Sequence, residues 1–280
     1  MNKKVLSLTL ATIGLTAAAA YAATNSVSFS QQGDKRCVAS NGIPDHATGQ
    51  FPNRGNPNSM REQRLKYCVD ATPTKGSRPT DRAKTIGVAL NGVPIRPGTA
   101  DWYDASSPRG HSRDRSSGWN LEGLGSREKL GMDHNHAHVD HQGLYHYHGM
   151  PNHLANLNGG SLMGYAADGF EIHYIGQKAT SSYKLKPGNR PTPPYGRYDG
   201  QFEQDWGFKA GSGNLDRCNG AETGRGYAYF ATDSFPFFPR CHWGEVSSDF
   251  VRKGGPGGKQ GKRPPKNGHR PPPPKKKKWW

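Results

Sequence analysis

Two runs of alternating histidine lie close together near the middle of the chain and carry its strongest chemical signal. They read HNHAH at residues 134–138 and YHYH at residues 145–148. Successive side chains of an extended strand point to opposite faces, so one face would present three imidazoles from the first run and two from the second. Imidazole is a common ligand of zinc, copper, iron and nickel, and ligands two residues apart on a strand can converge on one ion. The pattern therefore predicts a metal site.

Within this region we expect the ligands to be His138, His146 and His148. A turn-like DHQG segment at residues 140–143 separates His138 from the second run, and a hairpin there would bring all three rings to one sheet surface. Three neutral imidazoles with an open fourth position suit zinc or copper. Zinc could activate a bound water for hydrolysis, and copper offers storage, transfer or redox chemistry. No methionine-rich pattern accompanies the histidines, which argues against a Cu(I) carrier.

Two other interpretations of the same residues stay open. Histidine-rich stretches also occur as solvated surface, but seven of the twelve histidines fall within residues 134–153, with Asp133 and Asp140 among them. Those carboxylates could orient a ligating ring through its second nitrogen. Alternatively, the histidines could belong to a buried hydrogen-bonded network with Tyr145 and Tyr147. These tyrosines share the other face of the strand and are more typical of packing than of catalysis.

Asp168 is the candidate catalytic residue. It is a loop acid just before an expected strand, where it could be a general base or a metal ligand, although Asp-Gly is also ordinary turn chemistry. We expect a structural role for His242. We expect exposed positions outside any site for His111 and His269, because their neighbours are Ser and Arg or Pro and Lys. No nucleotide-binding glycine fingerprint and no G-x-S-x-G elbow is present, which excludes a Rossmann-type redox enzyme.

The N-terminus predicts export. Residues 1–22 combine a short positive region, an apolar core and a small-x-small site, which is the pattern of a signal peptide. The apolar stretch is too short for a convincing membrane span, so we expect no transmembrane helix and a periplasmic or secreted protein. Export permits disulfides, and the four cysteines allow three connectivities. Nearest-neighbour pairing predicts two bridges, Cys37–Cys68 and Cys218–Cys241.

A basic C-terminal segment accounts for most of the formal net charge of +16. Residues 252–280 carry eleven Lys and Arg and no acid, and Lys3 and Lys4 belong to the leader, so a formal +3 remains on residues 23–251. We therefore expect no specific nucleic-acid partner. Glycine, proline and lysine dominate the segment, which predicts a disordered tail. Its lysine run and two final tryptophans could bind an anionic envelope polymer or a lipid surface, or the tail could simply be solvated.

Between leader and tail, the composition predicts a loop-rich β domain. Short strand candidates recur at residues 85–90, 143–148, 169–175 and 226–232. The pair Asn91 and Gly92 is a strong turn signal, and no segment shows a sustained helical period of apolar residues. The sequence therefore predicts a mainly β fold: one compact domain over residues 23–251, stapled by two disulfides and followed by the disordered tail.

Several segments resemble the YHYH-domain proteins, a family of exported bacterial and eukaryotic proteins. The segment GLYHYHG at residues 143–149 contains the tetrapeptide for which the family is named. Six further segments resemble the same family: SNGIPDH at 40–46, GVALNGVP at 87–94, AHV at 137–139, GYAADGF at 164–170, LDRCNG at 215–220 and FPFFPRC at 235–241. The resemblance spans residues 37–245, and its motifs are specific in combination.

This resemblance implies a fold, export and the importance of the motif positions, but no particular reaction. By residue matching, His138, His146 and His148 are motif histidines, and His46 corresponds to one near the N-terminal motif. The first two histidines of the HNHAH run do not correspond to family histidines. The resemblance therefore selects the same three candidate ligands as the strand pattern.

One segment departs from the family pattern. Where the pattern reads Asp-Gly-Phe-Pro, this chain has Glu171 in place of the proline, followed by Ile172 and His173. The change adds a carboxylate and an imidazole, which are either site groups or surface residues.

The sequence is compatible with three functions. The first is an exported protein that binds zinc or copper through the three histidines, with or without hydrolytic activity. The second is an envelope-associated binding or structural module, in which histidines and tyrosines form a rigid polar core and the tail keeps the protein at a surface. The third is a hydrolase of an extracellular polymer that acts through Asp168 and a histidine without metal. The histidine pattern favours the first and leaves enzymatic activity open.

Overall fold

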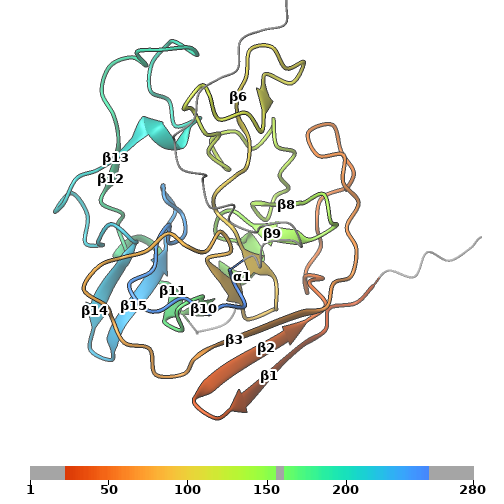
Figure 1. Cartoon of the computed structure of the whole chain (residues 1–280), viewed down its shortest axis with the longest axis vertical. Coiled ribbons are helices and arrows are strands. Elements are labelled where there is room, and N and C mark those ends of the chain that lie inside the picture. The colour runs from red at the N-terminus through yellow and green to blue at the C-terminus, as the bar shows by residue number, and fades with distance from the viewer. Residues whose placement is uncertain (1–22, 156–160, 252–280) are drawn as a thin grey trace, which may run out of the picture.

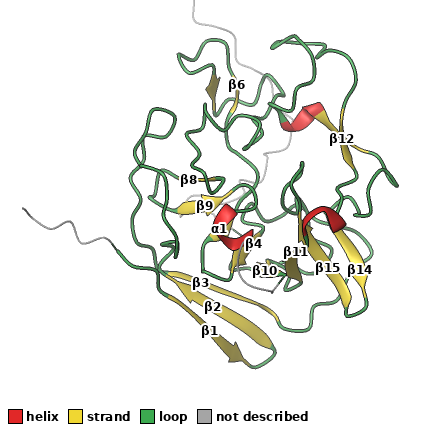
Figure 2. Ribbon diagram, turned by 180° about the vertical axis from the view of Figure 1, so that it is seen from behind, coloured by secondary structure: helices red, strands yellow, loops and turns green. Residues whose placement is uncertain are grey.

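The computed structural model describes residues 23–155 and 161–251. The expected leader at 1–22 and the expected basic tail at 252–280 lie outside the described residues. Strands and loops dominate what is described, as Figures 1 and 2 show, and helix is limited to α1 (Asn152–Ala155) and two 3-10 turns, η1 (Gly176–Lys178) and η2 (Glu203–Asp205). The predicted mainly β fold is confirmed. In the described ranges no helix is both long and apolar enough to cross a membrane.

A mixed sheet runs through the centre of the domain. Its strands are, in chain order, β4 (Gly87–Ala89), β5 (Pro94–Ile95), β8 (Ala137–Val139), β9 (Tyr145–Tyr147), β10 (Leu162–Ala166), β11 (Glu171–Tyr174), β14 (Gly220–Thr223) and β15 (Gly226–Ala231). In space they follow the order β14-β15-β11-β10-β4-β5-β9-β8. The pairs β5–β9 and β11–β15 are parallel and the others are antiparallel. The histidine-rich strands therefore form one end of this sheet.

A second, antiparallel sheet packs beside the first at the bottom of the view in Figure 1. It consists of β1 (Val27–Gln32), β2 (Lys35–Ser40) and β3 (Leu65–Asp70). Cys37 of β2 lies opposite Cys68 of β3 and forms a disulfide with it, and Cys218 forms a disulfide with Cys241. Both predicted pairings are confirmed. Two short ribbons complete the described strands, β6 (Trp102–Tyr103) with β7 (His111–Ser112) and β12 (Tyr183–Leu185) with β13 (Trp206–Phe208).

The main core lies on the central sheet and is rich in aromatic rings. The residues with no exposed surface include Ile95, Tyr145, Tyr147, Ile172 and Tyr229. Period-two alternation sets which side chains enter this core: on β11 Ile172 is buried while its neighbours on either side are partly exposed. The apolar burial on this sheet is what fixes the register of its strands.

The pairing of β4 with β10 depends on a glycine. A Cβ atom at Gly164 would lie 2.2 Å from the carbonyl oxygen of Val88, so a side chain at this position would force the strands apart. A smaller core of buried residues joins the two sheets, with Val38 of β2 and Val69 of β3 packed in one cluster with Val88 of β4. This smaller core packs the N-terminal sheet against the rest of the domain.

The predicted strands are present, although most are shorter than expected. The candidates at 85–90, 143–148, 169–175 and 226–232 became β4, β9, β11 and β15. Gly92 adopts φ +80° in the turn between β4 and β5, as the Asn-Gly signal indicated. The sequence did not predict β1 or β2, because their outward faces are polar and β1 is almost entirely exposed.

We expect that replacing Cys37 and Cys68 together by alanine will lower the free energy of unfolding by about 2–4 kcal/mol, because the bridge closes a long loop in the unfolded chain. The two residues are 31 positions apart. Urea unfolding of both proteins, with the midpoint and slope fitted separately, measures the loss. An unchanged midpoint would show that the β2–β3 pairing is stable without the covalent link.

Candidate metal centre

A tight hairpin brings the two histidine runs together. The antiparallel register of β8 and β9 places His138 directly opposite His146. The carboxylate of Asp140 accepts hydrogen bonds from the backbone N–H groups of Gln142 and Leu144, and Gly143 adopts φ +86°. Asp and Gly are the residues that such a turn favours. The hairpin predicted at residues 140–143 is confirmed.

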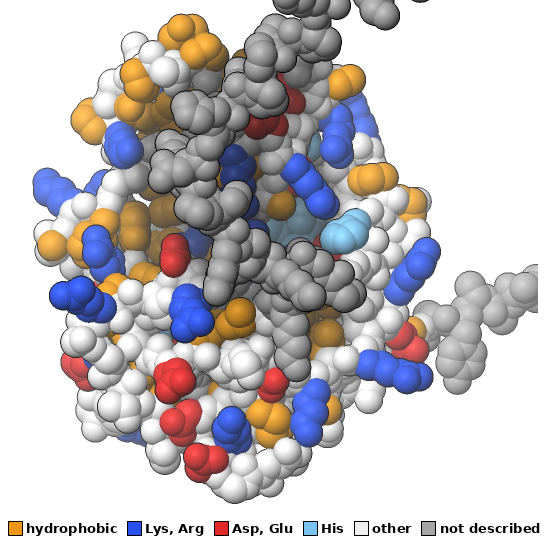
Figure 3. All heavy atoms as spheres, viewed as in Figure 1, with side chains coloured by type: hydrophobic (Ala, Val, Ile, Leu, Met, Phe, Trp, Pro, Cys, Tyr) orange, Lys and Arg blue, Asp and Glu red, His pale blue; other side chains and the backbone are white. Residues whose placement is uncertain are grey.

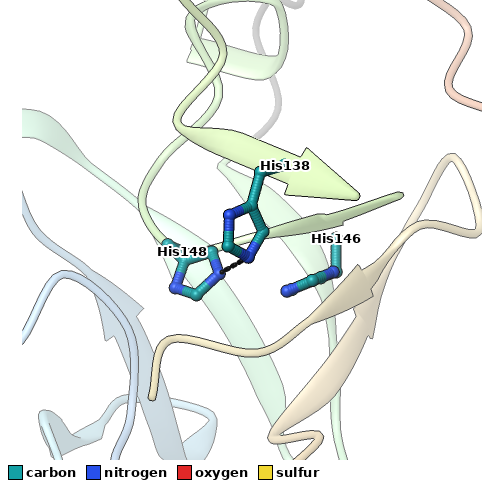
Figure 4. Close-up of side chains that lie close together, drawn as sticks. All are labelled: His138, His146 and His148. Carbon is teal, nitrogen blue, oxygen red and sulfur yellow. Dashed lines mark hydrogen bonds between the residues drawn. The ribbon is translucent and has the colours of Figure 1, made fainter. Parts of the chain in front are cut away.

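Three imidazoles converge on one face of this hairpin, as Figure 4 shows. His148 follows β9 and keeps the same strand parity as His146, so both rings lie on the face that His138 occupies. The ring centroids are 4.7 to 4.9 Å apart, and one ring nitrogen from each histidine lies within 4.8 Å of the other two. Within the described ranges this is the group of metal-ligand side chains that is compact enough to surround one ion.

Each of the three rings donates a hydrogen bond through Nδ1 to a backbone carbonyl. The Nδ1 atoms of His138, His146 and His148 lie 2.9, 3.1 and 3.1 Å from the carbonyl oxygens of Leu130, Leu144 and Pro97 respectively. A carbonyl oxygen can only accept, so each Nδ1 must carry the proton. In a neutral ring the lone pair is then on Nε2. The backbone therefore selects one tautomer for all three histidines, as the hydrogen-bond partners of metal-bound histidine do.

Two of these Nε2 atoms face each other at close range. The Nε2 atoms of His138 and His148 are 3.2 Å apart. With both protons on Nδ1, no hydrogen is left between them, and two lone pairs point at one another. A tetrahedral zinc ion with Zn–N bonds of about 2.0–2.1 Å requires its ligand nitrogens to be about 3.3 Å apart. The spacing of this pair therefore fits a shared cation, and the ligand nitrogen of His146 lies within 4.8 Å of both.

Burial favours the neutral form of all three rings, because it lowers the pKa of each. It lowers the pKa of His146 and His148 well below the usual range, and the positive charge of Arg96 adds to the shift. Burial lowers the pKa of His138 as well. A metal ion binds only an unprotonated imidazole. The lowered pKa values therefore favour the form of each ring that can act as a ligand.

Access to the cluster is from the side of His138. His146 is 3% exposed and His148 1%, whereas His138 is partly exposed. Figure 3 shows histidine side chains gathered at a hollow near the middle of one face. The charged groups nearby are paired: Arg96 donates to Asp140 at 2.7 Å, and Arg240 pairs with Glu122. The cluster is therefore a neutral nitrogen-rich site near the surface.

The tyrosines of the YHYH segment point to the opposite face and are fully hydrogen-bonded. The hydroxyl of Tyr145 donates to Asp133 at 2.7 Å, and the hydroxyl of Tyr147 lies 2.6 Å from Nε2 of His46 and accepts from Asn91 at 2.8 Å. Burial raises the pKa of both phenols, so they stay protonated. The predicted packing role of these tyrosines is confirmed. His46 belongs to this face, away from the three-histidine group.

Asp168 does not join the histidines. The residue is 1% exposed, and Oδ2 accepts hydrogen bonds from the hydroxyl of Tyr229 at 2.7 Å and the backbone N–H of Gly244 at 2.9 Å. Its Oδ1 has no hydrogen-bond partner among the described residues. His242 is also fully buried, and its Nε2 donates to the carbonyl oxygen of Ile86 at 2.8 Å. Both residues belong to the interior of the domain.

The expectation that His111 is exposed was wrong. Its side chain is 3% exposed, and its Nδ1 lies 3.1 Å from the carboxylate of Asp101. Although burial opposes it, the hydrogen bond to His111 lowers the pKa of Asp101. The Ser- and Arg-rich neighbours gave no signal of this, because the contact forms only when β6 pairs with β7. His269, the other histidine expected to be exposed, lies outside the described residues.

Comparison with known proteins identifies the family. The sequence profile described as "YHYH protein" matches residues 66–244, well over half of the chain. The chain belongs to the YHYH protein family. No curated protein and no solved structure matches it. The matched region contains His138, His146 and His148 together with the second disulfide, and it begins after His46. The metal-ligand candidates are therefore within the family region.

The lowered histidine pKa values predict a stability change with pH in the metal-free protein. Unfolded imidazoles titrate near pH 6.5, whereas His146 and His148 stay neutral in the folded state to lower pH. The unfolded chain therefore binds more protons below about pH 6.5, and stability falls as the pH falls. We expect a loss of up to about 1.4 kcal/mol between pH 7.5 and 5.5 for each imidazole that stays neutral. Urea unfolding in the presence of chelator measures it, and a pH-independent midpoint would contradict the assignment of neutral rings.

Proposed function

We propose that this YHYH-family protein is an exported metal-binding protein that takes one zinc or copper ion on His138, His146 and His148. The observation that carries the proposal is the common orientation of the three rings. All three Nδ1 atoms face backbone carbonyls, and one ring nitrogen of each histidine faces the other two. Such an arrangement leaves three lone pairs without a donor, which a cation would satisfy.

The donor set favours zinc or copper over harder cations. Neutral imidazoles suit zinc, copper, iron and nickel, whereas magnesium and calcium prefer oxygen ligands. Both disulfides occupy all four cysteines, so no thiolate competes for the ion. With three protein ligands a fourth position is open, where zinc would acidify a water molecule and copper would support transfer or redox chemistry.

A purely structural histidine–tyrosine core explains only one face of the hairpin. On the tyrosine face, the hydroxyls of Tyr145 and Tyr147 have protein partners. On the histidine face, Nε2 of His138 faces Nε2 of His148, which a hydrogen-bonded core of neutral rings does not satisfy. The third function, hydrolysis through Asp168, has less support, because that carboxylate is buried and already accepts two hydrogen bonds.

Export and surface attachment remain part of the proposal. The support for a periplasmic or secreted location is the formation of both disulfides, which reducing compartments disfavour. The division into a signal peptide at 1–22, a domain at 23–251 and a tail at 252–280 rests on the sequence. An anionic envelope polymer or lipid surface is the partner that the basic tail would bind.

We expect untagged protein, purified natively and reconstituted with zinc or copper, to retain about one ion per chain after gel filtration. Changing His146 and His148 together to alanine should abolish this retention, because two of the three lone pairs are lost. Inductively coupled plasma mass spectrometry gives the metal-to-protein ratio, and circular dichroism confirms that the variant is folded.

The matched control changes His134 and His141 to alanine. Both side chains are exposed, and the control removes the same number of imidazoles from the same segment. It should retain metal like the unaltered protein. Equal loss in both variants would point to loose surface binding, and equal retention in both would overturn the assignment of the ligands.

A further inference from the structure

A second cluster of side chains that could perform catalysis lies beside β10 and β11, in the half of the central sheet away from β8 and β9. It lines a cleft of ≈ 790 Å³. Ser161, Glu171 and His173 all line this cleft. The strand that carries two of them, β11, pairs with β15, and both lie apart from β8 and β9 in Figure 1. The cleft is therefore separate from the metal centre.

These three side chains form a continuous hydrogen-bonded chain. The hydroxyl of Ser161 lies 2.9 Å from Nδ1 of His173, and Nε2 of the same ring lies 2.8 Å from a carboxylate oxygen of Glu171. Glu171 and His173 are two residues apart on β11, so both face outward while Ile172 between them enters the core. Leu162 pairs with His173 in the β10–β11 register, which brings the preceding Ser161 beside the ring.

The chain of hydrogen bonds has a defined direction. An ionised Glu171 can only accept, so it selects the tautomer of His173 with the proton on Nε2. Nδ1 of His173 then has a free lone pair, and the hydroxyl of Ser161 is the donor to it. A serine that donates to an imidazole, which in turn donates to a carboxylate, is the arrangement that activates a serine nucleophile.

The side chains are also accessible. The side chain of His173 is 19% exposed and that of Glu171 44%. The imidazole can therefore exchange protons with a molecule in the cleft.

We propose that Ser161, His173 and Glu171 form an acyl-transfer site that hydrolyses carboxylic esters. Ser161 Oγ attacks the acyl carbon and its proton passes to Nδ1 of His173. The bond to the leaving alcohol then breaks, and the alcohol takes that proton. Water attacks the acyl-serine in the second half, giving its proton to His173 and releasing the carboxylic acid, and the proton returns to Ser161. Glu171 is a positioning residue that orients the imidazole.

The cleft favours a substrate with a negative charge. Arg36 and Arg225 line it together with the aromatic ring of Phe230, and Glu171 is the one acidic residue among the described residues of its lining. The guanidinium group of Arg36 lies 4.1 Å from the centre of the Tyr165 ring, which fixes its position. An ester that carries an acidic group would find opposite charge at the wall of the cleft.

A fluorophosphonate probe tests the site directly, because it reacts preferentially with serines activated by a base. We expect full-length protein to form one adduct, located at Ser161 by peptide mass spectrometry, and to hydrolyse 4-nitrophenyl acetate. Ser161→Ala should abolish both. His173→Gln should slow both by about 100-fold or more, the usual contribution of a general base.

Control variants and a chelator show whether the reactivity belongs to this cleft. Ser28→Ala, which removes an exposed hydroxyl of β1, should change neither reaction. Chelator should leave labelling intact, since the site does not depend on the metal centre. Glu171→Gln should slow labelling, and Glu171→Asp should restore part of the rate, which a purely structural role would not produce. Absence of an adduct at Ser161 in the unaltered protein, or equal labelling of His173→Gln, would overturn the proposal whatever the folding of the variants.

Discussion

The antiparallel pairing of β8 with β9 fixes the chemistry of both faces of the YHYH segment. Its register places His138 opposite His146, and the strand parity adds His148 to the same face. The two tyrosines consequently point into the main core, where they have no exposed surface. A shift of one residue would exchange the faces, placing the imidazoles among the apolar side chains of the main core and the phenols on the face of His138. The buried tyrosines therefore stabilise the register that assembles the histidine cluster.

Each face places polar atoms out of water, and the two faces satisfy them differently. On the tyrosine face the phenol hydroxyls find protein partners, Asp133 for Tyr145 and His46 with Asn91 for Tyr147. On the histidine face the backbone satisfies each Nδ1 and leaves the Nε2 atoms facing inward. A buried polar atom without a partner costs free energy, and the proposed cation would satisfy the lone pairs of the second face.

The local pattern predicted much of this centre, because its determinants are close in sequence. The hairpin at 140–143, the parity of His146 and His148 and both disulfides were evident from spacing and turn chemistry alone. The partners of these groups were not, since Leu130 and Pro97 reach the rings only in the folded chain. The burial of His111 likewise depends on a ribbon that Ser- and Arg-rich composition does not signal. Contacts between distant segments, in which the local sequence shows no periodicity, account for what sequence reasoning missed.

X-ray absorption spectroscopy of the metal-loaded protein tests the central claim most directly, because it reports the atoms bound to the ion. The proposed site predicts multiple scattering from three imidazole rings, with nitrogen at about 2.0–2.1 Å when the ion is zinc. The fourth ligand would be an oxygen or nitrogen atom at the open position. A first shell made of oxygen or sulfur donors, without the imidazole signature, would contradict the account. The three histidines would then be part of a hydrogen-bonded polar core and not metal ligands.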